Sequence, residues 1–220
     1  MVIRRIDIPN AEQGMSIPSP PEIIDTLLDR LVRNGIIGTK KYFSDAGCAT
    51  GMVLASANAH SLPSFGAEYN PELFGECEFN IGLLRDQGAV SDEYPLIMSQ
   101  GNFLEDATYD RAGVSFGDIG TFFNYDNNDG NLASRVAECA APGTILVVLD
   151  RKEEPKSFPG LAFVDIVTPG LPEGVSLAEL KRSNPQDYRD IAKRRYELSG
   201  FDGFVRAPYE AIFCAHIFRK

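Results

Sequence analysis

The sequence predicts an α/β protein in which a mostly parallel sheet carries helices on both faces. Short apolar runs of strand length alternate with longer segments of helical spacing along the chain. This alternation is typical of parallel strands joined by helical crossovers. The chain has 220 residues, of which 44% are hydrophobic and 24% are charged, and these values fit a single globular domain.

The first part of the chain reads as a helix followed by a βαβα unit. The helix is predicted over residues 19–35, because it opens on Ser and Pro, has apolar residues at helical spacing and closes on a glycine. A strand over 40–47 then runs into a turn, and a helix of small and apolar residues follows over 50–60. A second strand is predicted over 64–70, and a helix with Pro at its first position over 71–88.

The same alternation continues, with less regularity toward the end of the chain. Further strands are predicted over residues 96–103, 112–120, 144–150, 160–170 and 209–220. Helices are predicted over 129–143 and over 176–200, the second of them interrupted by Pro185.

Charge and cysteine content exclude several classes of function. A formal net charge of -10 disfavours binding to the phosphate backbone of a nucleic acid. The four cysteines form no CxxC pair, so we expect reduced thiols and a cytoplasmic protein rather than a disulfide framework or a zinc site. No apolar run approaches the roughly 18 residues that a spanning helix needs, so no membrane segment is expected.

The stretch "FSDAGCATG" at residues 43–51 is the strongest candidate for a binding turn. Asp45 stands at the end of a predicted strand, and small residues follow at Gly47, Ala49 and Gly51. Ligands of parallel sheets bind beyond the carboxyl ends of the strands. Glycines there let a ligand lie against the main chain, and the start of the next helix favours an anionic group.

The spacing of small and acidic residues indicates a nucleoside-type ligand without a pyrophosphate. The dinucleotide fingerprint G-x-G-x-x-G would require a small residue at position 52, which is Met52. Glu68 ends the next strand, where an acid commonly accepts hydrogen bonds from ribose hydroxyls. A dehydrogenase-like nucleotide binder is therefore disfavoured, although it stays one of the alternatives.

These residues resemble the motifs of the class I S-adenosylmethionine (SAM)-dependent methyltransferases. "DAGCATG" is similar to their acid followed by G-x-G-x-G, with Ala49 in place of the middle glycine, and "GAEYNPEL" is similar to the second motif. "GNFLED" resembles the third, with Asn102 in place of an Asp that bonds the adenine amino group. The resemblance implies a Rossmann-like three-layer α/β/α sandwich whose seven-stranded sheet has an antiparallel last strand, with SAM as cofactor and S-adenosylhomocysteine (SAH) as product.

A narrower resemblance lies ahead of the first motif. "PSPPEIIDTLLDRL" is similar to the lead-in helix of the non-SET histone-lysine methyltransferases and their small prokaryotic relatives, with Ser19 in place of a Thr. The resemblance covers roughly residues 16–150. From the length we expect one domain over 1–220, with an N-terminal segment and helix (1–35), a cofactor-binding half (36–150), and sheet-completing and substrate-side elements (151–220). The residues expected to bind the cofactor are Ser19, Asp45, Gly47, Ala49, Gly51, Glu68, Asn102 and Phe103.

Residues for the methyl acceptor are expected after the fourth strand. We place that strand over 112–120, so that Asp118 lies near its carboxyl end, beside the cofactor, where it can orient the acceptor or act as a base. Asn124 and Tyr125 are expected in a polar loop with aromatic walls, where they can hold an amine or a hydroxyl. Turn chemistry is the alternative explanation for all three. A cation between Asp118 and Asp150 is disfavoured, and no metal is expected.

Two functions remain besides the dehydrogenase alternative. The first is a SAM-dependent methyltransferase that transfers a methyl group by in-line displacement to a small molecule or a protein side chain. The second is a catalytically silent SAM-binding module, for which Ala49 and Asn102 would be the marks of lost activity. The sequence leaves the acceptor and the oligomeric state open.

Overall fold

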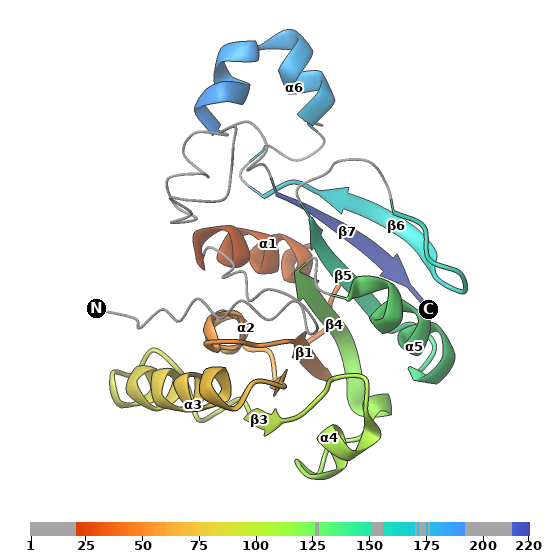
Figure 1. Cartoon of the computed structure of the whole chain (residues 1–220). Coiled ribbons are helices and arrows are strands. Elements are labelled where there is room, and N and C mark those ends of the chain that lie inside the picture. Colours follow the sequence, from red (N-terminus) through yellow and green to blue (C-terminus); the bar gives the residue numbers. More distant parts are fainter. Residues whose placement is uncertain are drawn as a thin grey trace.

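The computed structural model describes residues 21–125, 128–150, 156–169, 171, 175, 177–191 and 213–220. The strands of this part form one sheet in the order β3-β2-β1-β4-β5-β7-β6 (Figure 1). They are β1 (Tyr42–Ala46), β2 (Ser64–Glu68), β3 (Leu96–Gln100), β4 (Ile119–Tyr125), β5 (Ile145–Asp150), β6 (Ala162–Val167) and β7 (Cys214–Arg219). The expected Rossmann-like sheet, with its antiparallel last strand, is confirmed.

All strands except β7 run in the same direction. β1 pairs in parallel with β2 and with β4, and the parallel pairs β2–β3 and β4–β5 extend the sheet on each side. β7 is antiparallel to both β5 and β6. The ends of β1 to β6 therefore meet at one edge of the sheet, which we call the carboxyl edge.

Helices cover both faces of the sheet and make the three layers (Figure 1). One face carries α1 (Pro21–Arg33) and α2 (Met52–Ala59), and their apolar side chains pack on alternate residues of β1, β4, β5 and β7. α3 (Pro71–Asp86) packs beside α2. The opposite face carries α4 (Asp106–Asp110) and α5 (Asp129–Cys139).

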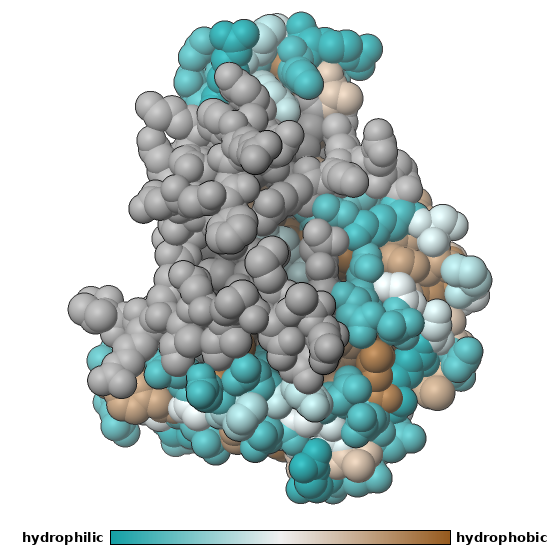
Figure 2. Space-filling view, in the orientation of Figure 1, coloured by the Kyte–Doolittle hydropathy of each residue, from teal (hydrophilic) through white to brown (hydrophobic). Residues whose placement is uncertain are grey.

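The helix α6 (Leu177–Ser183) lies beyond the carboxyl edge, near the end of β6 and the start of β7 (Figure 1). Figure 2 shows mainly hydrophilic residues over this part. Residues 185–191 are again helical, so Pro185 separates two helical stretches as the sequence predicts. Within the described residues, no helix is both long and apolar enough to cross a membrane.

The prediction of a strand over 112–120 is wrong. The fourth strand is Ile119–Tyr125, and the residues before it form the short 3-10 helix η1 (Phe116–Asp118). Val114 and Phe116 are buried at alternate positions in the core, which imitates the two-residue period of a strand. Asn124 and Tyr125 are therefore the last two residues of a strand and not part of a loop.

Several predictions fall on residues that the structure does not describe. These are Ser19, residues 192–200 of the predicted helix over 176–200, and the first residues of the predicted strand over 209–220.

Gly66 of β2 is packed closely against α2 and the turn after β1, so we expect even a substitution by alanine to destabilise the protein. A Cβ at Gly66 would lie 2.4 Å from Cδ1 of Leu54 and 2.9 Å from Sγ of Cys48. We expect Gly66→Ala to lower the free energy of unfolding by about 1–3 kcal/mol through overpacking, measured by urea denaturation. Gly82→Ala in α3 is the control, since nothing lies within 4 Å of its Cβ, and it should raise stability by about 0.5–1 kcal/mol. Equal effects of the two substitutions would contradict this account of the packing.

Candidate functional site

The candidate site lies at the carboxyl edge of β1, β2 and β3. Asp45 is the second-last residue of β1 and Glu68 is the last residue of β2. Gln100, which ends β3, pairs with Glu68, and Asn102 and Phe103 follow it. The parallel pairing therefore brings together acids and loop residues that are far apart in the sequence.

The turn between β1 and α2 has an unusual backbone. Gly47, Ala49 and Gly51 have φ angles of 91°, 44° and 82°, so every second residue adopts the left-handed conformation. This conformation costs an L-residue such as Ala49 roughly 1 kcal/mol. The N–H groups of Gly47 and Cys48 both donate to the carbonyl of Ala67, at 2.9 and 3.0 Å. Ala49 therefore keeps the shape that a glycine would give.

Glu68 joins this turn to the start of α3. Its Oε2 accepts a hydrogen bond from the N–H of Ala49 at 2.9 Å, and its Oε1 accepts one from the N–H of Asn70 at 2.8 Å. Only 7% of Glu68 is exposed, and this burial raises the pKa of its carboxyl group, against the lowering effect of the backbone N–H groups. A carboxylate offers about four lone-pair sites, so Glu68 can still accept a hydrogen bond from a ligand.

Asp45 is a buried carboxyl group next to another acid. Only 4% of the residue is exposed. Burial, and secondly the neighbouring Glu68 carboxylate, raise the pKa of Asp45 to about 8. A cationic group in the site would reverse this effect, because it favours the charged form of both acids. The pair is therefore suited to a positively charged ligand group.

The loop after β3 lies directly beside Glu68, since the N–H of Gly101 donates to the Glu68 carbonyl at 2.8 Å. The side chain of Asn102 accepts from the N–H of Leu104 at 3.0 Å and donates to Oε1 of Glu105 at 3.3 Å. Asn102 Oδ1 therefore shapes the loop and keeps one lone pair for a ligand.

Tyr69 is a candidate site residue that the sequence reasoning missed. It follows Glu68 at the carboxyl edge, and 52% of it is exposed. An exposed aromatic ring on the residue after Glu68 can stack on a planar ligand group. The available signal was its place directly after the acid that ends a strand, in "GAEYNPEL".

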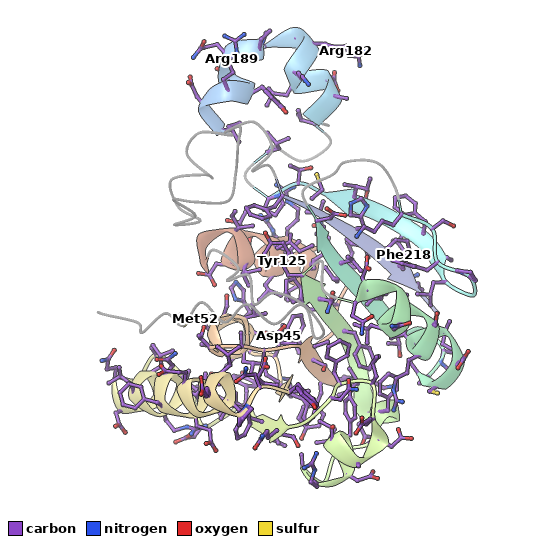
Figure 3. The ribbon with its side chains drawn as sticks, in the orientation of Figure 1. Asp45, Met52, Tyr125, Arg182, Arg189 and Phe218 are labelled. Atoms are coloured by element: carbon purple, nitrogen blue, oxygen red, sulfur yellow. The ribbon has the colours of Figure 1, made fainter. Side chains whose placement is uncertain are left out.

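The end of β4 brings two further predicted residues to the same edge. Asn124 is buried, and its Nδ2 donates to the carbonyl of Ala46 at 3.0 Å, which ties β4 to β1. The ring of Tyr125 is buried as well, edge-on to Phe213 with 5.6 Å between the ring centres. Figure 3 labels Tyr125 and Asp45 near the centre of the molecule. The expected aromatic walls are absent among the described residues of this strand, because its two Phe side chains lie in the core.

Asp118 lies at the opposite edge of the sheet. It precedes Ile119, which pairs with Tyr42 at the start of β1, three residues before Asp45 and thus about 10 Å along the strand. Its carboxylate accepts from the N–H and the hydroxyl of Ser115, both at 2.9 Å, and these bonds lower its pKa. Asp118 is a cap of η1, and the prediction that it stands at the carboxyl end of a strand is wrong.

A cation between Asp118 and Asp150 is also incompatible with this arrangement. Asp150 ends β5 at the carboxyl edge, and its carboxylate pairs with Nζ of Lys156 at 2.7 Å. Lys156 also pairs with Asp129 of α5, at 2.6 Å. Within the described part of the chain, no group of three or more His, Cys, Asp or Glu residues could hold a metal ion.

The raised pKa of Asp45 predicts a pH-dependent cost in stability. In the unfolded chain a carboxyl of this type titrates near pH 4, and in the folded protein near pH 8. Between these values the folded state binds more protons, so stability falls as pH rises from about 4 to 8. We expect Asp45→Asn to raise the melting temperature at pH 8 by several degrees and to change it much less at pH 5.

Thermal unfolding at both pH values measures this effect. Asp86→Asn, at an exposed position of α3, is the matched control and should leave the pH dependence as it is. If Asp45→Asn lost as much stability between pH 5 and 8 as the unmodified protein does, the raised pKa of Asp45 would not be the cause of the pH dependence.

The sequence matches no protein-family model and no curated relative, whereas several solved structures have a similar fold. Geranyl diphosphate methyltransferase, solved with SAM, aligns with a TM-score of 0.54 and 14% identity over 90% of this chain and 84% of that one. Geranyl diphosphate C-methyltransferase from Streptomyces coelicolor, solved with SAH, has a TM-score of 0.52 and 13% identity over 88% of this chain and 78% of that one.

The [4+2]-cyclase SpnF aligns about as well, with a TM-score of 0.51 and 12% identity over 89% of this chain and 80% of that one. Because a cyclase has the same architecture and all these identities are low, the likeness establishes the fold and not the reaction. The chain has the Rossmann-like fold of the class I SAM-dependent methyltransferases.

Proposed function

We propose that the chain is a SAM-dependent methyltransferase. The observation that carries this proposal is the pair of buried acids at the ends of adjacent strands, Asp45 and Glu68, beside a turn that is held open in the left-handed conformation. A cationic amino acid linked to a nucleoside needs these parts: acids for its positive charges and its ribose, and a bare backbone against which it can lie.

The residues present fit the amino-acid end of SAM. Asp45 is placed for the ammonium group, because burial and the neighbouring Glu68 raise its pKa and a positive charge beside it would favour its charged form. The N-terminus of α2 begins at Gly51 without a side-chain cap, so its N–H groups are available to a carboxylate. Ser19 belongs to this proposal as a further contact to that carboxylate.

The nucleoside end fits the neighbouring strands. Glu68 can accept hydrogen bonds from both ribose hydroxyls, and the exposed ring of Tyr69 can cover one face of the base. Asn102 and Phe103 stand where the base edge would lie. A pyrophosphate beside these two acids is disfavoured, because its negative charges oppose the ionisation of both carboxyl groups, and this disfavours a dinucleotide.

The chemistry requires little of the protein. When bound, SAM supplies a methyl group on a positively charged sulfur, and the C–S bond breaks as the acceptor's lone pair forms the new bond, leaving SAH. The chain's own residues position both partners and exclude water. Asn124 and Tyr125 are proposed to orient the acceptor, because they lie at the carboxyl edge of the strand next to β1. A general base is needed only for an acceptor that is protonated at working pH.

The proposed acceptor is a small molecule or a protein side chain. The net charge of -10 repels polyanions. We also propose a relationship to the non-SET histone-lysine methyltransferases. The observation that supports this relationship is α1, which precedes the turn in the chain and packs its apolar face on the sheet.

Removal of the Glu68 carboxylate should abolish SAM binding. Calorimetric titration should show Glu68→Gln binding SAM at least about a hundredfold more weakly, since hydrogen bonds to a charged group contribute about 1.5–3 kcal/mol each. Asp118→Asn is the control and should bind normally, because Asp118 lies at the other edge. The proposal would be wrong if Glu68→Gln bound SAM normally. It would also be wrong if the unmodified protein bound NAD tightly and did not bind SAM.

Turnover separates an enzyme from a silent binding module. Incubation with SAM and a metabolite or peptide extract should produce SAH at a rate that Asn124→Ala lowers by at least about tenfold, if positioning accounts for much of the rate. SAM affinity should stay nearly unchanged in that variant. SAM binding without SAH formation in any extract would favour the silent module.

A further inference from the structure

Three sulfur atoms meet between the turn after β1, the helix α3 and the strand β3. Sγ of Cys48, in the turn, lies 3.9 Å from Sγ of Cys77 in α3. The thiol of Cys77 in turn donates to Sδ of Met98 in β3 at 3.2 Å. Cys48 and Cys77 are buried, and Met98 is partly buried. We call these three residues the sulfur cluster.

The sulfur cluster is enclosed by glycines and apolar side chains. A Cβ at Gly51 would lie 2.6 Å from Sγ of Cys77, and one at Gly66 would lie 2.9 Å from Sγ of Cys48, so both glycines leave room for sulfur. The buried apolar residues packed with the cluster are Leu54, Ala55, Ile81, Leu84 and Val90. Such a shell limits the access of solvent to a bound ion and sets its redox potential.

Sulfur is concentrated in this part of the core. The structure describes four cysteines and two methionines, and four of these six residues belong to one hydrophobic cluster: Cys48, Met52, Cys77 and Met98. Packing alone requires no sulfur, because aliphatic side chains of similar volume fill a core as well. The concentration therefore points to the chemistry of the sulfur atoms.

The spacing and type of these sulfur atoms fit a soft metal ion. An ion about 2.3 Å from each thiolate, with its ligands about 120° apart, holds two sulfurs about 4 Å apart, close to the 3.9 Å between Cys48 and Cys77. Met98 lies nearer to Cys77, and its three rotatable bonds let its sulfur adjust. Thiolate and thioether ligands together favour Cu(I). The cluster differs from the metal-binding groups excluded above, because its third ligand is a methionine.

We propose that Cys48, Cys77 and Met98 bind one Cu(I) ion in a three-coordinate site. Each thiol that binds the ion releases its proton to solvent, and no electron is transferred, because copper enters and stays as Cu(I). The ion connects the turn, α3 and β3, so its binding should stabilise the folded state by mass action. This inference does not depend on the proposed function.

The test titrates the reduced full chain with Cu(I) under anaerobic conditions, in competition with bicinchoninate, whose Cu(I) complex is coloured. The unmodified protein should take up one Cu(I) per chain, and its melting temperature should rise. Cys77→Ala should lower the Cu(I) affinity at least about a hundredfold, because even changes around the ligands of a metal cost about 10- to 100-fold. Met98→Leu nearly conserves the side-chain volume and should lower the affinity by about tenfold, at the lower end of that range.

Two matched controls should keep the full Cu(I) affinity. Cys139→Ser removes an exposed cysteine, and Met52→Leu removes the other methionine of the hydrophobic cluster. The proposal would be overturned if the unmodified protein took up no Cu(I), or if Met98→Leu bound Cu(I) as tightly as the unmodified protein. A loss of affinity in Cys139→Ser, or an equal loss in Met52→Leu and Met98→Leu, would also overturn this choice of ligands. Met98→Leu keeps the test decisive even if Cys77→Ala does not fold.

Discussion

The pair of hydrogen bonds that Glu68 accepts from the main chain is the interaction on which the candidate site depends. A buried carboxylate is costly unless donors surround it, and here the donors are the N–H groups of Ala49 and Asn70. One belongs to the turn after β1 and the other to the start of α3. The turn, the second strand and the helix must therefore close around one side chain, so the site is a product of the fold and not an addition to its surface.

Asp45 shows the opposite balance, because it is buried with an unfavourable charge. Burial and a neighbouring acid both favour its neutral form, and a side chain chosen for stability alone would be apolar. Ala49 is similar, since its backbone conformation is one that glycine adopts more easily. The buried carboxyl group of Asp45 and the left-handed backbone of Ala49 both lower stability, and they lie within five residues of each other. Such unfavourable features in an otherwise consistent fold are typical of a binding site.

Much of this could be predicted from the sequence, because strand-ending acids and small residues report on position directly. β1, β2, β3 and β5 lie where the apolar runs place them, and parallel pairing brings their ends together. The fourth strand was predicted too early in the chain, because Val114 and Phe116 are apolar at alternate positions, as strand residues are, although they belong to a loop and to η1. Asp118 was therefore predicted at the wrong edge of the sheet. The helix α4 could not be predicted, because it has five residues, too few to show a helical period.

The place of β7 has a consequence for the order of folding. β7 lies between β5 and β6 and pairs with both, although it follows β6 in the chain by many residues. During synthesis β5 therefore keeps an open edge, and β6 stays without its neighbour until residues 214–219 have left the ribosome. Open strand edges template pairing with other chains, and non-local pairing is slow. The growing chain is thus most exposed to aggregation just before this strand is released, when its β1 to β5 core can already be assembled.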